Sequence, residues 1–234
     1  MADVQLATGL ATRDAGASSD AAASGPRAAL LRALAADTRF SVVSNNCWGA
    51  HLYQSLGIPY ATPFIGLFMP PADYLELIEH LDELIGAELT FVGESGSASV
   101  NAWRERERLS YPIGRLGGRV EVDFQHYHSE EEARATWARR CRRLNPDPAR
   151  RFFKFDDREG ATAAHIAAFA ALALPNKVCF TARRYEAPTV LAPAAPGEDH
   201  VLDGVSLANV TRRRFNTLRW ISALPRWLPL PSLV

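Results

Sequence analysis

Residues 40–51 read FSVVSNNCWGAH, and this stretch decides the fold that we expect for the chain. Phe40–Val43 is a short, β-branched run of the kind that forms a buried strand. Ser44–Gly49 is rich in residues that favour tight turns, and Ala50–Leu56 can then form a short helix. A buried strand, a polar turn and a helix in this order indicate the start of an α/β unit.

The same alternation of apolar runs and helical patterns continues to about residue 182. The expected strands are Phe40–Val43, Glu88–Val92, Val120–Phe124, Phe152–Phe155 and Val178–Thr181. Helices of roughly 10–16 residues between such strands require crossover connections. The sequence therefore predicts a three-layer, Rossmann-like α/β domain with a mixed, mostly parallel sheet.

Two of the expected helices carry clear local signals. In residues 71–86 the apolar side chains fall at helical spacing on one face, namely Tyr74, Leu77, Ile78, Leu81 and Leu84. The second helix begins at Ser129, where Ser129 and Glu132 have the spacing of a capping box, and it should run to about Leu144. A further helix is expected from Thr162 to about Leu172.

We divide the chain into three parts. Residues 38–184 form the α/β domain, and residues 1–37 form an Ala-rich extension that is disordered or partly helical, with a short helix at 26–36. Residues 185–234 form an irregular, Pro-rich C-terminal extension. Its apolar end, Trp220–Val234, packs on the domain, is disordered, or acts as an interfacial anchor with Trp side chains at the depth of the lipid headgroups.

Composition limits the classes of function. The chain has 26 Lys plus Arg and 26 Asp plus Glu residues, so its formal net charge is zero and we expect no nucleic-acid partner. Three widely spaced cysteines favour neither a disulfide framework nor a zinc site. We find no secretory signal and no run of about 18 apolar residues. We expect a cytoplasmic protein, with peripheral contact to the inner face of the membrane through the tail as an alternative.

Ligands of α/β folds bind beyond the carboxyl ends of strands, so the polar residues there are the candidate site. After the first strand, the candidate binding residues are Asn45, Asn46, Trp48 and His51. They can hold a phosphate, a carboxylate or sugar hydroxyls, whereas the absence of G-x-G-x-x-G argues against a dinucleotide. Cys47 is a candidate nucleophile in the same turn. The structural alternative is a tight turn with packed side chains.

A second group of candidates follows the strand at 120–124. His126 is a candidate acid–base residue, because imidazole titrates near neutral pH. Asp123 is a candidate catalytic carboxylate in the same segment. His126 and His128 share a face if the strand persists, but two imidazoles are an incomplete metal ligand set. The structural alternative is a pair of hydrogen-bonded histidines at a strand end.

A third group follows the last two strands. Asp156 and Arg158 can hold a diphosphate, directly or through Mg²⁺ or Mn²⁺, because carboxylates are ligands for hard cations and guanidinium groups bind phosphate bidentately. Thr181 emerges at the end of the last strand and can add to the same cleft. The alternative for residues 156–160 is a solvated turn before the next helix.

Several motifs in sequence resemble those of one bacterial family. They are SNNCWG-x-HLYQ from Ser44, YPIGRL from Tyr111, D-F-x-HY-x-SEEEA from Asp123, F-x-K-F-x-D-R-x-G from Phe152 and NKV-x-FTA from Asn176. Together they resemble domain-of-unknown-function family nineteen-nineteen over about residues 40–182. Members are commonly named as exopolysaccharide or capsule biosynthesis proteins, so the resemblance implies an α/β three-layer fold and a role in making surface polysaccharide. It implies no catalytic residues.

Three hypotheses for function follow. The first is a glycosyltransferase-like enzyme that acts on a nucleotide sugar or a polysaccharide intermediate, with His126 as acid–base residue. The second is acyl transfer to a sugar, with Cys47 as nucleophile and a histidine as base. The third is a non-catalytic binding or scaffold protein of a polysaccharide assembly complex, docked through its apolar tail.

Overall fold

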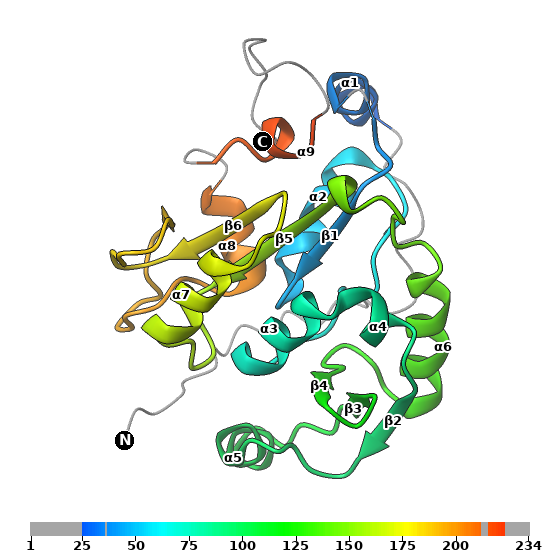
Figure 1. The fold of residues 1–234 in the computed structure, drawn as a ribbon, viewed down its shortest axis with the longest axis vertical. Helices are drawn as coiled ribbons and strands as arrows, with labels where there is room; N and C mark the ends of the chain where they lie inside the picture. Colours follow the sequence, from blue (N-terminus) through cyan, green and yellow to red (C-terminus); the bar gives the residue numbers. More distant parts are fainter. Residues whose placement is uncertain (1–24, 36, 212–214, 223–234) are drawn as a thin grey trace.

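The computed structural model describes residues 25–35, 37–211 and 215–222 (Figure 1). The expected disorder of residues 1–24 and the expected roles of residues 223–234 therefore lie outside the described residues. Within the described ranges the chain is an α/β protein, as its sequence pattern predicts.

Four parallel strands form the central sheet, in the order β1-β5-β6-β7. They are β1 (Ser41–Ser44), β5 (Arg151–Asp156), β6 (Lys177–Thr181) and β7 (Val190–Leu191). In the register, Ser44 lies opposite Lys154, and Asp156 lies opposite Phe180. The carboxyl ends of β1, β5 and β6 therefore meet at one edge of the sheet, where ligands bind in such folds.

Side chains alternate between the two faces of this sheet, as the period of a strand requires. Val42, Phe152 and Phe180 point to one face, in a core that includes Leu52 and Leu207. The helices that supply this layer are α1 (Pro26–Ala35), α2 (Ala50–Leu56), α8 (Gly204–Thr211) and α9 (Thr217–Ile221).

The opposite face carries the second core. Val43, Phe153 and Phe155 pack there, and the ring of Phe155 stacks on Tyr74 with centroids 5.5 Å apart. The covering helices are α3 (Pro71–Glu79), α4 (Leu81–Ile85), α6 (Glu130–Cys141) and α7 (Ala163–Ala171). The sheet lies between two helical layers, so the predicted three-layer α/β class is confirmed.

Three antiparallel strands form a second, small sheet in the order β2-β3-β4, beyond α3 from the central sheet (Figure 1). They are β2 (Leu89–Val92), β3 (Ile113–Leu116) and β4 (Val120–Asp123), and α5 (Ala98–Arg106) lies between β2 and β3 in sequence. We expected the first and last of these segments in the main sheet and did not predict β3. Gly117 and Gly118 have positive φ angles of 56° and 69°, which allow the tight turn that pairs β3 with β4.

Two helices differ in detail from expectation. The helix expected over 71–86 is interrupted at His80, whose φ of −116° and ψ of 33° separate α3 from α4. The cap of α6 is also shifted: Ser129 Oγ accepts the Glu132 N–H (3.1 Å), but the Glu132 carboxylate accepts the N–H of His128 (2.9 Å) instead of that of Ser129.

The segment after residue 185, which we expected to be irregular, contains α8 and α9. The backbone of α8 begins at Gly204, where an added Cβ would lie only 2.8 Å from Asn46 Oδ1 and from Trp48 N. From α9, the Trp220 ring packs edge-on against Phe152, with centroids 5.1 Å apart. The C-terminal helices are thus part of the core, and α8 directly supports the turn that follows β1.

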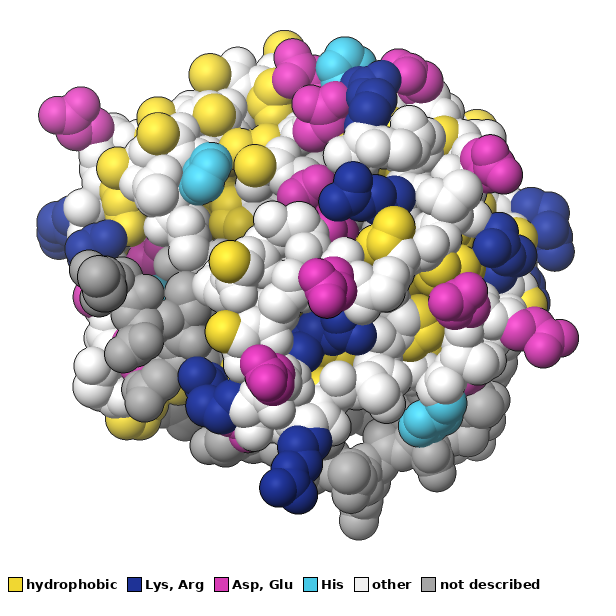
Figure 2. Space-filling model, turned by 90° about the horizontal axis from the view of Figure 1, so that it is seen from below, with side chains coloured by type: hydrophobic (Ala, Val, Ile, Leu, Met, Phe, Trp, Pro, Cys, Tyr) yellow, Lys and Arg dark blue, Asp and Glu magenta, His cyan; other side chains and the backbone are white. Residues whose placement is uncertain are grey.

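The surface carries interspersed charges. Figure 2 shows Lys and Arg side chains scattered among Asp and Glu on the face seen from below, in keeping with the zero net charge. Within the ranges that the structure describes, no helix is both long and apolar enough to cross a membrane.

The close approach of α8 leads to a prediction about Gly204. We expect Gly204→Ala to lower the free energy of unfolding by about 1–3 kcal/mol, because the new methyl group overlaps the Asn46 side chain and the Trp48 backbone. Urea denaturation followed by tryptophan fluorescence measures the change.

Gly93→Ala is the matched control, since a Cβ at that glycine meets nothing within 4 Å. It should change stability by no more than about 0.5 kcal/mol. Equal stability of the two variants would contradict the packing of α8 described above.

Candidate functional site

Four buried polar side chains form a closed network at the carboxyl ends of β1 and β5. Asn45 and Asn46 follow β1, Lys154 and Asp156 belong to β5, and all four are at most 5% exposed. Lys154 Nζ donates to Asn45 Oδ1 (3.1 Å) and Asn46 Oδ1 (2.9 Å). The two amide nitrogens donate to Asp156 Oδ1 (3.1 Å) and Oδ2 (2.9 Å), and Lys154 also forms an ion pair with this carboxylate.

The network holds a negative charge in the protein interior. Burial by itself raises the pKa of Asp156, but the Lys154 ammonium and the two amide donors outweigh it and hold that pKa below its ordinary value. A buried charge that is paired and fully hydrogen-bonded tolerates the low-dielectric interior. The turn at residues 44–47 is therefore fixed to β5 by polar bonds as well as by packing.

Cys47 lies at the tip of this turn and faces His126. The distance between Cys47 Sγ and His126 Nε2 is 3.6 Å. Asn46 caps the 3-10 turn Cys47–Gly49 by accepting the Trp48 N–H (3.3 Å). The backbone of His126 is also fixed, because its main-chain N–H donates to the carbonyl of Gly66 (3.0 Å). Two polar turns from opposite sheets thus bring a thiol and an imidazole into contact.

Both groups of this pair are uncharged at neutral pH. Burial raises the pKa of the partly buried Cys47 thiol to about 11. His126 lies at the surface, yet burial of part of its ring lowers its pKa. A neutral imidazole beside a neutral thiol can accept the thiol proton when an electrophile arrives.

Glu159 supplies a further carboxyl group near the thiol. Its side chain is 9% exposed, and its Oε2 atom has no hydrogen-bond partner among the described residues. Burial and, next, the charge of Asp156 raise the pKa of Glu159 to about 8. The charge of Glu159 in turn contributes to the raised pKa of Cys47. With a φ of 58°, Glu159 occupies the left-handed region, a strained conformation that is common at functional sites.

The paired carboxylates of Asp156 and Asp157 do not fit the expected Mg²⁺ or Mn²⁺ site. Asp157 accepts the N–H groups of Val201 (2.9 Å) and Ala182 (2.8 Å), while Asp156 is occupied within the buried network. These donors take up the oxygen positions that a hard cation would need. Among the described residues, no group of three or more His, Cys, Asp or Glu side chains has the arrangement of a metal site.

The remaining candidates lie around this centre in different roles. Trp48 is buried against Phe180, with ring centroids 5.4 Å apart. Arg158 is 3% exposed and donates to the Val201 carbonyl (3.0 Å). The buried Thr181 hydroxyl donates to Thr189 Oγ1 (2.9 Å). The partly exposed His51 lies in the first turn of α2. The structure therefore brings Asn45, Asn46, Cys47, His126 and Asp156 together, whereas the Arg158 and Thr181 side chains are bonded to Val201 and Thr189.

Asp123 ends β4 and is fully buried. Its backbone pairs with Phe68 in both directions (2.9 Å each), which brings the small sheet against the segment beside Cys47. Neither carboxylate oxygen accepts a well-formed hydrogen bond among the described residues, and the nearby Tyr111 hydroxyl offsets only part of the effect of burial on the pKa of this carboxyl. Burial, and then the charge of Glu121, raise the pKa of Asp123 to about 7.

A family model described as "Domain of unknown function (DUF1919)" matches residues 28–222. The chain belongs to the DUF1919 family. The match extends beyond residues 40–182 at both ends and takes in α1, α8 and α9, in agreement with their place in the core.

A relative from Haemophilus influenzae, described as an uncharacterized protein, is 35% identical over 147 residues. The alignment covers 63% of this chain and 64% of that relative, so it spans less than two thirds of the relative's length.

Two residues of the candidate site, Lys154 and Glu159, were absent from the sequence-based candidates. Lys154 and Asp156 are two residues apart in a strand, a spacing that places both on one face, and a lysine in an otherwise apolar strand is the signal for this pair. Glu159 gives no comparable signal, because a glutamate before a glycine has the appearance of a solvated turn.

Asp123 makes the stability of the protein depend on pH. The native carboxyl keeps its proton up to about pH 7, whereas the unfolded chain releases it near 3.8, the ordinary pKa of an aspartate. Between these values the native state binds more protons, so the free energy of unfolding falls as pH rises. We expect Asp123→Asn, which stays neutral, to make this decline shallower in urea denaturation at a series of pH values.

Glu105→Gln is the control, because Glu105 is an exposed carboxylate on α5. It should leave the decline unchanged. An identical slope in the wild type and Asp123→Asn would contradict a protonated native Asp123.

Glu159 leads to a prediction about the reactivity of Cys47. Above pH 8 the ionised Glu159 disfavours the thiolate, so Glu159→Gln should lower the pKa of Cys47 and speed its alkylation by iodoacetamide roughly two- to tenfold at such pH. Below pH 8 the native carboxyl is protonated, and the difference should largely disappear. Peptide mapping by mass spectrometry gives the rate at Cys47, with Cys141 as internal reference.

Glu130→Gln, at an exposed position on α6, should leave the alkylation rate unchanged. A rate at Cys47 that does not respond to Glu159→Gln at any pH would show that this carboxyl does not act on the thiol.

Proposed function

We propose that this protein catalyses acyl transfer to a sugar hydroxyl, with Cys47 as nucleophile and His126 as general base. The observation that carries the proposal is the 3.6 Å contact between Cys47 Sγ and His126 Nε2 at the carboxyl edge of the parallel sheet. A thiol within reach of an imidazole is the basic unit of cysteine-dependent covalent catalysis. The resemblance to proteins named for exopolysaccharide biosynthesis supports a sugar as acceptor.

The reaction has two balanced steps. In the first, His126 Nε2 accepts the thiol proton, Cys47 Sγ bonds to the carbonyl carbon of an activated acyl donor, and the donor's leaving group departs with the proton from His126. In the second, His126 accepts the proton of a sugar hydroxyl, whose oxygen attacks the thioester. The thiolate of Cys47 then leaves and regains the proton. The high pKa of the thiol means that proton transfer accompanies the attack.

The glycosyltransferase hypothesis has less support from the geometry. It needs Asp156 and Arg158 to contact a diphosphate, yet Asp156 is satisfied by Lys154 and the two asparagines. Arg158 is buried and bonded to a backbone carbonyl. An acyl donor that reacts at Cys47 requires neither side chain to be released.

Incubation with p-nitrophenyl acetate or acetyl-coenzyme A tests the proposal. We expect one acetyl group on Cys47, found by mass spectrometry of the intact protein and its peptides, and removed by hydroxylamine. Cys47→Ala should abolish the adduct, and His126→Gln should slow its formation by about 10²–10⁴-fold, the usual contribution of a general base.

Cys141→Ala is the matched control, since Cys141 is also a partly exposed free thiol. It should acylate like the wild type. Acylation distributed equally over the cysteines, or unaffected by His126→Gln, would refute acyl transfer at Cys47.

A further inference from the structure

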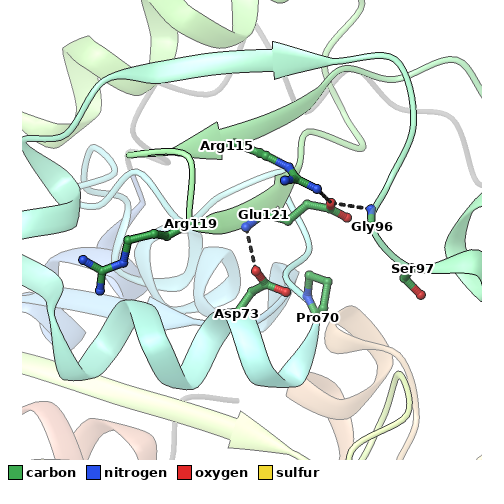
Figure 3. Close-up of a pocket in the computed structure, with 7 residues that line it drawn as sticks. All are labelled: Pro70, Asp73, Gly96, Ser97, Arg115, Arg119 and Glu121. Atoms are coloured by element: carbon green, nitrogen blue, oxygen red, sulfur yellow. Dashed lines mark hydrogen bonds and ion pairs between the residues drawn. The ribbon is translucent and has the colours of Figure 1, made fainter.

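A polar cavity of about 280 Å³ lies outside the site described above (Figure 3). It lies between the N-terminus of α3, the β3–β4 hairpin and the loop at residues 93–97. Asp73 lines it from the side of α3 and Arg115 from the hairpin, with Glu121 between them and Gly96 and Ser97 on the loop side (Figure 3). Its volume is just below the range of about 300–1,000 Å³ for small-molecule pockets, so it suits a ligand of one ring.

The walls are fixed without a ligand. Glu121 is 4% exposed, and its carboxylate accepts the Ser95 hydroxyl and the Gly96 N–H (2.8 Å). The Arg115 guanidinium lies 3.7 Å from the same carboxylate. The backbone N–H of Glu121 donates to Asp73 Oδ1 (2.7 Å). These bonds join the helix, the hairpin and the loop into one preorganised pocket.

Two side chains of the pocket retain hydrogen-bonding capacity. The Arg115 side chain is 38% exposed, and its contact to Glu121 Oε2 is 3.7 Å long, so its guanidinium N–H groups can donate to a ligand. The Asp73 carboxylate accepts the Glu121 N–H at Oδ1, and no other residue of the described chain donates to it. The pocket therefore offers a donor and a charged acceptor from opposite walls.

The charges of the pocket select the chemistry of its ligand. Asp73 and Glu121 repel an anion, while Arg115 and Arg119 repel a cation. Arg119 is further held by Glu76 and Glu83 at the rim. A hydroxyl group can donate to a carboxylate and accept from a guanidinium at the same time. A neutral polyhydroxylated ring can therefore hydrogen-bond to the carboxylates and to the guanidinium groups of the pocket without introducing charge.

A short chain segment connects this pocket to Cys47. The carbonyl of Leu67 lies 4.0 Å from Cys47 Sγ, and Pro70 is part of the pocket wall. Between them, the Met69 N–H donates to the Asn45 carbonyl (3.0 Å). Three residues of extended chain span at most about 10 Å, so the pocket and the thiol are neighbours on the scale of a short oligosaccharide.

We propose that this pocket is a subsite for the acceptor sugar, in which Asp73 and Arg115 bind the hydroxyl groups of one neutral ring and so direct a hydroxyl of a neighbouring ring of the same oligosaccharide toward Cys47. This inference rests on the proposed acyl transfer for its catalytic meaning, whereas the binding of a sugar ring can be tested by itself.

Saturation-transfer-difference NMR on Cys47→Ser, with a panel of neutral methyl glycosides, measures binding without turnover. We expect at least one glycoside to receive saturation. Asp73→Asn, added to this protein, should weaken its binding about tenfold, because an amide can still accept the Glu121 N–H but is a weaker acceptor for hydroxyls than a carboxylate. Glu79→Gln removes an exposed charge from the same helix and should leave binding unchanged.

The outcomes separate this proposal from the preceding one. With Cys47 intact, Asp73→Asn should form the acetyl adduct at the wild-type rate but raise the KM for the acceptor glycoside. If the adduct forms but the KM for the acceptor is the same in Asp73→Asn and in the wild type, the sugar subsite is refuted and acyl transfer is not. Glycoside binding that depends on Asp73 without any adduct would overturn acyl transfer alone. Absence of saturation for the whole panel, or binding only of amines or Ca²⁺, would overturn the subsite.

Discussion

The buried pairing of Lys154 with Asp156 is the constraint on which the rest of the site depends. Two opposite charges in a fully enclosed position persist only if every remaining donor and acceptor is satisfied. Here the hydrogen bonds come from Asn45 and Asn46, which lie in the turn after β1 and are more than 100 residues away in sequence. The electrostatic requirement of β5 thereby dictates the conformation of the turn after β1, and with it the position of Cys47.

A second constraint acts from the other sheet. The segment at residues 65–70 is paired with Asp123 and hydrogen-bonded to His126 on one side, and it is tied to Asn45 through Met69 on the other. Gly66 permits this contact, since its φ is 76° and an added Cβ would lie 3.2 Å from His126 Cβ. The thiol and the imidazole meet because one strip of backbone is bonded to both turns.

Much of the frame could be predicted from the sequence, because buried strands and amphipathic helices have local periodic patterns. Cys47 and His126 could be predicted as candidates, since polar residues directly after strands are frequent at ligand sites, but their contact across two separate sheets could not be predicted. The separate sheet could not, because the pairing of β3 with β4 depends on a short glycine turn between weak strand signals. The burial of Glu159 could not be predicted from the sequence either, because it depends on a left-handed backbone conformation and on tertiary packing that no local pattern encodes.

The position of α8 has a consequence for the way the protein is made. Gly204 packs directly against Asn46 and Trp48. A nascent chain of only two hundred residues therefore contains the strands, Cys47 and His126, but it lacks the helix that packs against the turn after β1. The turn that carries Cys47 gains the backbone that packs against it only after α8 has been synthesised. Formation of the candidate site is thereby coupled to synthesis of this helix, and a chain terminated before Gly204 carries the thiol without the helix that packs against its turn.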